Sequence, residues 1–189
     1  MTLLILGLVL FLGIHSLSIA NEPLRDRLHA SMGEAAFKVL YSFVSLAGLL
    51  LIIWGYGAAR LDPTVLYIPP TWLRHVSLLL LIPVFPLLFA TYFPGRIKAK
   101  IGHPMLVAVK LWALAHLLAN GMLHDVMLFG SFLAWAIADR ISMKRRTQRP
   151  IPTLPASKAN DLIAIAGGLA VYVVMVMWAH RWLFGVAPM

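Results

Sequence analysis

Six apolar runs separated by short polar segments dominate the hydrophobic pattern of this 189-residue chain. The runs cover residues 1–21, 39–59, 75–95, 101–124, 126–138 and 162–180. A helix needs about 20 mostly apolar residues to cross the hydrocarbon layer of a bilayer. The pattern therefore predicts an all-α integral membrane protein, a bundle of about six transmembrane helices. The fifth run is short, so the fourth and fifth runs also fit a shallow hairpin that enters and leaves the membrane on one side.

The composition predicts the same class of protein. Hydrophobic residues make up 61% of the chain and charged residues 12%, whereas soluble domains carry roughly 25% charged residues. A soluble core of this size could not bury so much apolar surface, so we expect one transmembrane domain over residues 1–189 and no soluble domain. Because cysteine is absent, disulfides, iron–sulfur clusters and covalently attached c-type haem are excluded.

The cations lie almost entirely in alternate polar segments. With six spans, one side receives Arg25, Arg27, Lys38, Arg96, Lys98, Lys100, Arg140, Lys144, Arg145, Arg146, Arg149 and Lys158. The other side receives Arg60, Arg74 and Arg181. Cytoplasmic loops carry the excess of Lys and Arg, so we expect a multi-pass protein of the inner (cytoplasmic) membrane with both termini outside. The net charge of +9 then serves orientation and contact with lipid headgroups, and it does not indicate nucleic acid.

Histidine is the residue type with the clearest chemical potential in this chain. Four of the seven histidines lie in a polar segment or near the ends of runs and are expected to be structural: His29, His75, His124 and His180. His15 and His116 differ, because apolar residues flank each of them on both sides. Polar side chains at membrane depth face the bundle interior and mark binding sites or helix contacts.

The neighbours of His116 allow two interpretations. Trp112 and Asn120 lie four residues to either side of it, so all three side chains share one helix face. In the first interpretation, His116 bonds to Asn120 and holds the fourth and fifth helices together. In the second, His116 binds a cofactor, and Asn120 orients its imidazole or caps the helix end before Gly121.

Among metal centres, the residues favour b-type haem. Two neutral imidazoles from different helices are a common way to hold haem iron inside a bundle. Zinc or copper would need further ligands close by, and no cysteine or carboxylate lies at comparable depth. His15 and His116 are the expected iron ligands, with Trp112 and Asn120 supporting the site. His103, at the start of the fourth run, is a rival ligand.

Six short motifs are specific enough to compare with known families. They are YSFVSLAG at 41–48, WGYG at 54–57, GHPM at 102–105, LWALAHLLANG at 111–121, LFG at 128–130 and WAIADR at 135–140. Together they resemble the NnrU family over nearly the whole chain, which identifies residues 1–189 as one NnrU-like transmembrane domain. That family is linked to bacterial denitrification, and its biochemical role is poorly defined.

The resemblance extends to a better understood relative, the plant 15-cis-zeta-carotene isomerase. That membrane protein uses b-type haem, ligated by two histidines, to convert one cis double bond to trans. One of its ligands lies in the first shared helix, where His15 matches it. The other follows a His-Pro pair by the spacing that separates His103-Pro104 from His116. The resemblance therefore implies that His15 and His116 ligate haem b.

Three functions stay open at this stage. The first is a haem-dependent membrane enzyme, in its sharpest form a cis–trans isomerase of a lipophilic polyene, with Trp112, Trp135 and Tyr41 as candidate pocket walls. The second is a non-enzymatic accessory protein for nitric oxide and nitrite respiration, with a respiratory membrane protein as its partner. The third is a helical membrane protein without a cofactor. The expected partners are the lipid bilayer and either a lipophilic polyene or a respiratory membrane protein, and nucleic acid is not among them.

Overall fold

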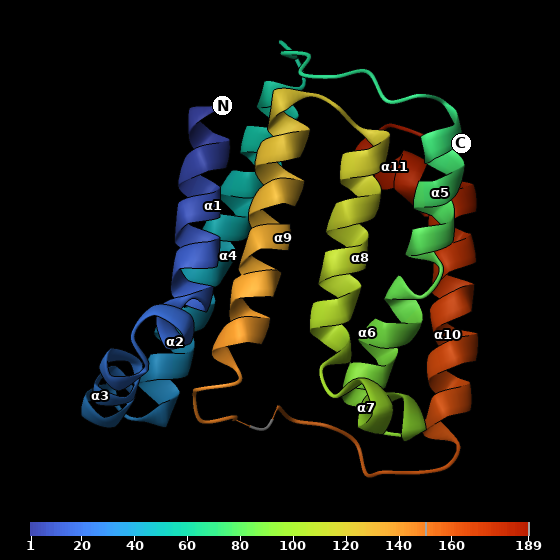
Figure 1. The fold of residues 1–189 in the computed structure, drawn as a ribbon. Coiled ribbons are helices and arrows are strands. Elements are labelled where there is room, and N and C mark those ends of the chain that lie inside the picture. The colour runs from blue at the N-terminus through green and yellow to red at the C-terminus, as the bar shows by residue number, and fades with distance from the viewer. Residues whose placement is uncertain (150, 189) are drawn as a thin grey trace. The chain divides into compact units, whose positions relative to one another are not determined.

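The computed structural model describes residues 1–149 and 151–188, and its regular secondary structure consists of helices joined by loops (Figure 1). Over these residues, β-type pairing is limited to one isolated bridge between Val65 and Met122. The all-α prediction is therefore confirmed. Pro150 and Met189, which belong to the domain expected over residues 1–189, lie outside the described residues.

Close contacts divide the chain into two compact units, each assembled from two segments. We call Met1–Tyr67 with Gly121–Gln148 the first unit and Ile68–Asn120 with Arg149–Met189 the second unit. Each unit thus combines two segments that are separated in the sequence.

The first unit contains three long helices, α1 (Thr2–His15), α4 (Glu34–Ala59) and α9 (Leu123–Ser142), and two short ones, α2 (Leu17–Ala20) and α3 (Glu22–Met32). Small residues let α1 and α4 approach until their backbones touch. A Cβ atom on Gly48 would lie 2.7 Å from the Phe11 nitrogen, and one on Gly55 would lie 2.2 Å from the Leu4 nitrogen. Such glycines are typical of contacts between membrane helices, where close packing replaces a hydrophobic driving force.

The second unit contains α5 (Trp72–Leu81), α6 (Val84–Tyr92), α7 (Arg96–Ile101), α8 (Pro104–Ala119) and α10 (Asn160–Val174). After α10 the chain continues through a π-helical turn, η1 (Met175–Ala179), into α11 (His180–Phe184). Pro83 separates α5 from α6, because proline has no N–H to donate to the helix. Val84, Leu87 and Ala108 form the buried core between α6 and α8.

Within residues 1–149 and 151–188, three helical segments are long and apolar enough to cross a membrane: Glu34–Ala59, Trp72–Tyr92 and Asn160–Phe184. This is fewer than the six spans that the sequence pattern predicts. The helices α1 and α8 are apolar but contain only 14 and 16 residues. The helix α9 has 20 residues and carries three charged ones, Asp125, Asp139 and Arg140.

Two of the predicted runs end earlier than expected. The run 1–21 is interrupted at Ser16, which separates α1 from α2, and Asn21 then caps α3 by accepting a hydrogen bond from the Leu24 N–H at 2.9 Å. The run 101–124 does not stay helical to its end, because Asn120 has extended backbone angles (φ −131°, ψ 131°). At Asn21 and at Asn120, a polar side chain bonds to a nearby backbone atom and so competes with the helix.

Candidate functional site

His15 is the last residue of α1, and aromatic rings from three helices of the first unit surround its imidazole. The Phe11 ring of α1 stacks on it, with ring centroids 4.3 Å apart and planes inclined by 28°. Tyr41 of α4 and Trp135 of α9 meet it edge-on, with centroid distances of 5.2 and 6.1 Å. The half-buried imidazole thus lies in an aromatic enclosure that depends on the packing of α1, α4 and α9.

The main chain fixes the tautomer of His15. Its Nδ1 lies 2.6 Å from the carbonyl oxygen of Phe11, four residues earlier in the helix. A carbonyl oxygen only accepts hydrogen bonds, so Nδ1 carries the hydrogen and Nε2 of the neutral ring carries the lone pair. Histidines that ligate metals are oriented by such a bond from the other ring nitrogen. His15 is therefore arranged locally as an Nε2 ligand.

His116 in the second unit repeats this arrangement. It lies in the last turn of α8, and its Nδ1 is 2.8 Å from the carbonyl oxygen of Trp112, again four residues earlier. The Trp112 ring lies beside the imidazole at a centroid distance of 5.3 Å. The predicted contact between Trp112 and His116 is thus present, and the main-chain carbonyl of Trp112 takes part in it.

Asn120 caps the C-terminal end of α8. Its Nδ2 donates to the carbonyl oxygen of His116 at 2.9 Å, and its backbone N–H bonds to the same oxygen at 2.9 Å. Of the two roles that the sequence suggested for Asn120 in a cofactor site, this contact is the helix cap. The cap fixes the backbone that carries the imidazole.

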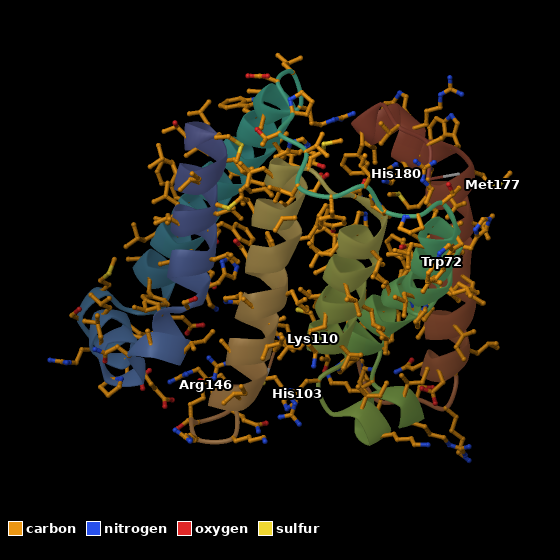
Figure 2. All side chains as sticks on the ribbon, turned by 45° about the horizontal axis from the view of Figure 1, so that its top comes forward. Trp72, His103, Lys110, Arg146, Met177 and His180 are labelled. Atoms are coloured by element: carbon orange, nitrogen blue, oxygen red, sulfur yellow. The ribbon has the colours of Figure 1, made fainter. Side chains whose placement is uncertain are left out.

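His103 is the N-cap residue of α8, at the end of the helix near α7 (Figure 2). It precedes His116 by 13 residues, which corresponds to ~20 Å along a helix that rises 1.5 Å per residue. Two nitrogens so far apart cannot ligate the same iron. His103 is therefore a rival to His116 as a ligand, and it cannot complete a pair with it.

Two buried side-chain polar atoms among the described residues have no hydrogen-bond partner: Ser45 Oγ and Trp135 Nε1. Both belong to the first unit, where Trp135 contacts His15 and Ser45 lies one helical turn after Tyr41. Leaving such a group unsatisfied costs about 1–3 kcal/mol. A hydrogen-bond acceptor on a bound molecule would satisfy the Trp135 N–H, so this orphaned donor fits a ligand beside His15.

A polar cluster of Tyr56, His124 and Asp125 lies in the first unit, and the sequence pattern did not predict it. The Tyr56 hydroxyl donates to Asp125 Oδ1 at 2.5 Å, and His124 Nε2 lies 3.5 Å from the same oxygen. The other carboxyl oxygen accepts from the Met122 N–H at 3.2 Å. His124 and Asp125 are each only 4% exposed. A carboxyl group within apolar sequence is a signal that should have drawn attention to this position.

His180 and His29 have contacts with other parts of the chain. His180 lies at the start of α11, and its Nδ1 is 2.7 Å from the carbonyl oxygen of Val186, six residues later in the chain. His29 of α3 meets the Phe37 ring edge-on at 5.4 Å. Over residues 1–149 and 151–188, no three His, Asp or Glu side chains gather into a group that could hold a metal ion.

A family model described as NnrU protein matches residues 3–188. The matched range includes His15, His103 and His116, together with all the helices of both units apart from the first residue of α1. No curated protein and no solved structure matches the chain. The family model therefore shows family membership, and none of the comparisons assigns a chemical role to a residue.

Proposed function

The chain belongs to the NnrU family, and from this premise we propose that it is a multi-pass membrane protein that binds b-type haem through His15 and His116. The observation that carries the proposal is the arrangement shared by these two histidines. Each donates from Nδ1 to the carbonyl oxygen four residues earlier, and each has an aromatic ring at that earlier position. In the neutral form, each imidazole then carries its lone pair on Nε2, the nitrogen through which it would bind a metal.

The residues around the histidines suit the chemistry of this cofactor. Bound haem supplies an iron centre whose reactivity depends on its axial ligands and on the polarity of its surroundings. The carbonyls of Phe11 and Trp112 hold the imidazoles in one tautomer and increase their basicity as ligands. Tyr41 and Trp135 keep water away from His15, and the Trp135 N–H is available to a carboxylate of the cofactor.

Packing within each unit supports more than three membrane crossings. In the first unit, α1 runs antiparallel to α4, with Leu4 against Gly55 and Phe11 against Gly48 (Figure 1). Since α4 is a candidate span, α1 lies in the same layer along its whole length. In the second unit, α8 packs against α5 and α6, which together make up the candidate span Trp72–Tyr92. We therefore retain the proposal of six crossings.

The distribution of cations within each unit supports a location in the inner membrane. In the first unit, the cations of α3 and the end of α9 lie at one end, and Arg60 follows α4 at the other. In the second unit, the cations of α7 lie at one end, and Arg74 and Arg181 at the other. This segregation favours cation-rich ends in the cytoplasm.

Two activities are compatible with such a site. The first is cis–trans isomerisation of a lipophilic polyene, supported by the aromatic, apolar enclosure of His15 and by the relationship of the family to the plant isomerase. The second is an accessory role in nitric oxide and nitrite respiration. The orphaned Trp135 N–H favours a ligand with a hydrogen-bond acceptor, which a hydrocarbon polyene lacks and which haem carboxylates and nitrogen oxides possess.

Haem content per chain, measured by absorbance after purification in detergent, tests the proposal. We expect His15→Ala and His116→Ala to lose haem, while His103→Ala retains it. His180→Ala is the matched control, because His180 also donates from Nδ1 to a carbonyl but lies in α11. Equal haem content in all four variants would contradict the assignment. Products from an added cis-polyene, assayed with the loaded wild-type protein, then distinguish isomerase from accessory protein.

A further inference from the structure

A pocket of about 540 Å³ opens at one end of the second unit, beyond the last residue of α6 and before the first turn of α10. Three cations line it, Arg96 and Lys98 of α7 and Lys158 of the segment that precedes α10. Asp161 is the acidic residue in its wall. The charge balance of the lining is therefore positive.

The hydrogen bonds of the pocket leave two of these cations available. Both oxygens of Asp161 accept from backbone N–H groups, at 2.9 Å from Arg96 and at 3.0 Å from Ile97. The Lys98 ammonium donates to the carbonyl oxygen of Thr91 at 2.8 Å. Within the described residues, no carboxylate pairs with the side chains of Arg96 and Lys158. Two cations without a counter-charge at one cavity predict an anionic ligand.

The walls of the pocket are held in place before any ligand arrives. The Asn160 amide donates to the carbonyl oxygens of Pro94 and Pro155, at 2.9 and 3.0 Å. The Asp161 carboxylate fits against Gly95 so closely that a Cβ atom there would lie 2.3 Å from Oδ1. A preorganised site loses less conformational entropy when it binds a ligand.

The position of the pocket relative to the candidate membrane spans indicates that its anionic ligand is a lipid headgroup. The candidate span Trp72–Tyr92 ends two residues before the first lining residue, Pro94, and the candidate span Asn160–Phe184 begins directly after the lining residues that precede α10. The pocket thus lies where apolar helices leave the hydrocarbon layer, at the level of the lipid headgroups. Basic pockets between transmembrane helices at this level bind anionic headgroups.

We propose that this pocket binds the phosphate of an anionic phospholipid, with Arg96 and Lys158 as its ligands. The exposed side chains of both residues reach the phosphate from the rim, while Lys98 and Asp161 keep α7 in position. This site is separate from the haem proposal, because it uses other residues and a different class of ligand. The lipid would anchor α7 and the start of α10 to one leaflet.

The test uses the full chain, purified and stripped of lipid in detergent, with short-chain phospholipids as probes. Binding is measured by native mass spectrometry for dioctanoyl phosphatidylglycerol, dioctanoyl phosphatidylcholine and inorganic phosphate. We expect phosphatidylglycerol to bind at least about tenfold more tightly than phosphatidylcholine. The double variant Arg96→Gln/Lys158→Gln should lose this preference. The control Lys144→Gln/Arg145→Gln removes two exposed cations from the first unit and should retain it.

Each other outcome overturns the proposal. Equal binding of the two lipids by the wild-type chain would show that the pocket does not recognise a headgroup charge. Equal loss in the double variant and in the control would show an effect of net charge alone. Inorganic phosphate that binds as tightly as phosphatidylglycerol would assign the pocket to a free anion. The wild-type comparisons decide the question even where the double variant does not fold.

Discussion

His15 and His116 share one local hydrogen-bond geometry, but the residues around the two imidazoles come from different structural elements. The Phe11 carbonyl orients His15, while rings from α4 and α9 enclose it, so the surroundings of His15 depend on contacts between helices. The orienting contacts of His116 come from Trp112 and Asn120 on its own helix or directly after it. Changes to the packing of α1, α4 and α9 should therefore disturb the ring enclosure of His15, whereas the bond from His116 Nδ1 to the Trp112 carbonyl lies within α8.

Gly48→Ala, which changes the packing of α1 against α4, should give the largest loss of stability. The new Cβ atom would lie 2.7 Å from the Phe11 nitrogen and 3.0 Å from its Cα, so α1 would have to move away from α4 together with the carbonyl that orients His15. We expect a loss of about 3 kcal/mol in unfolding free energy, at the upper end for an overpacked core. Thermal unfolding in detergent, followed by circular dichroism, measures the loss.

Gly57→Ala is the matched control for that experiment. Gly57 lies on the same helix, and a Cβ atom there would meet nothing within 4 Å. Alanine also favours helix over glycine by about 1 kcal/mol, so this variant should be no less stable than the wild type. An equal loss of stability in both variants would mean that the close approach of α1 to α4 does not hold the first unit together.

Tyr56→Phe tests the polar cluster that connects α4 with α9. It removes the hydroxyl that donates to Asp125 at 2.5 Å and leaves a buried carboxyl group with one partner fewer. We expect a loss of about 2 kcal/mol, since hydrogen bonds to charged groups are worth roughly 1.5–3 kcal/mol. Chemical denaturation measures it against Tyr172→Phe, which removes a bond to the neutral Leu78 carbonyl at 3.0 Å and should cost about 1 kcal/mol. A larger loss in the control would contradict the role of the cluster.

Trp135→Phe separates the role of a side-chain N–H from that of an aromatic ring. The ring contact with His15 would persist, but the orphaned donor would be gone. Without haem, stability should stay the same or rise, because an unsatisfied polar group has been removed. With haem, affinity should fall by about 1 kcal/mol, or roughly fivefold.

Trp112→Phe is the corresponding change beside His116. It leaves the main-chain carbonyl that receives Nδ1 in place, so haem affinity should change by less than about twofold. A haem titration followed by absorbance compares the two variants. A larger loss for Trp112→Phe than for Trp135→Phe would reverse the contrast between the two histidines.

Asn120→Ala should reduce stability less than Gly48→Ala or Tyr56→Phe. It removes the hydrogen bond from the amide to the carbonyl oxygen of His116 and leaves the backbone bond to that oxygen intact. We expect a loss of about 0.5–1 kcal/mol in stability, the worth of one partly exposed neutral hydrogen bond. Faster amide hydrogen exchange in the last turn of α8, with unchanged exchange in α1, would locate this effect. Unchanged exchange in α8 would show that the cap is dispensable.

The sequence was informative where the physical signal is local. Apolar runs marked the helices, since burial in lipid or protein requires continuous apolar faces. The position of Trp112 one turn before His116 followed from helical spacing. The same spacing places Phe11 one turn before His15, but that signal was overlooked.

Contacts between distant residues could not be predicted in this way. Tyr41 and Trp135 reach His15 from α4 and α9, and glycines set how closely α1 approaches α4. Tyr56 and Asp125 lie 69 residues apart in the chain. Three candidate spans stand where the apolar runs predicted six, because the turn at Ser16 and the extended backbone of Asn120 leave α1 and α8 with only 14 and 16 residues.

The most direct test of the central claim is the absorption spectrum of the wild-type chain, purified with haem supplied during expression. The spectrum is recorded in the oxidised state and again after reduction with dithionite. Ligation by two imidazoles predicts a sharp Soret band and low-spin ferrous bands, which disappear in His15→Ala and His116→Ala. A colourless wild-type protein would contradict the account and leave His15 and His116 as contacts within their helices.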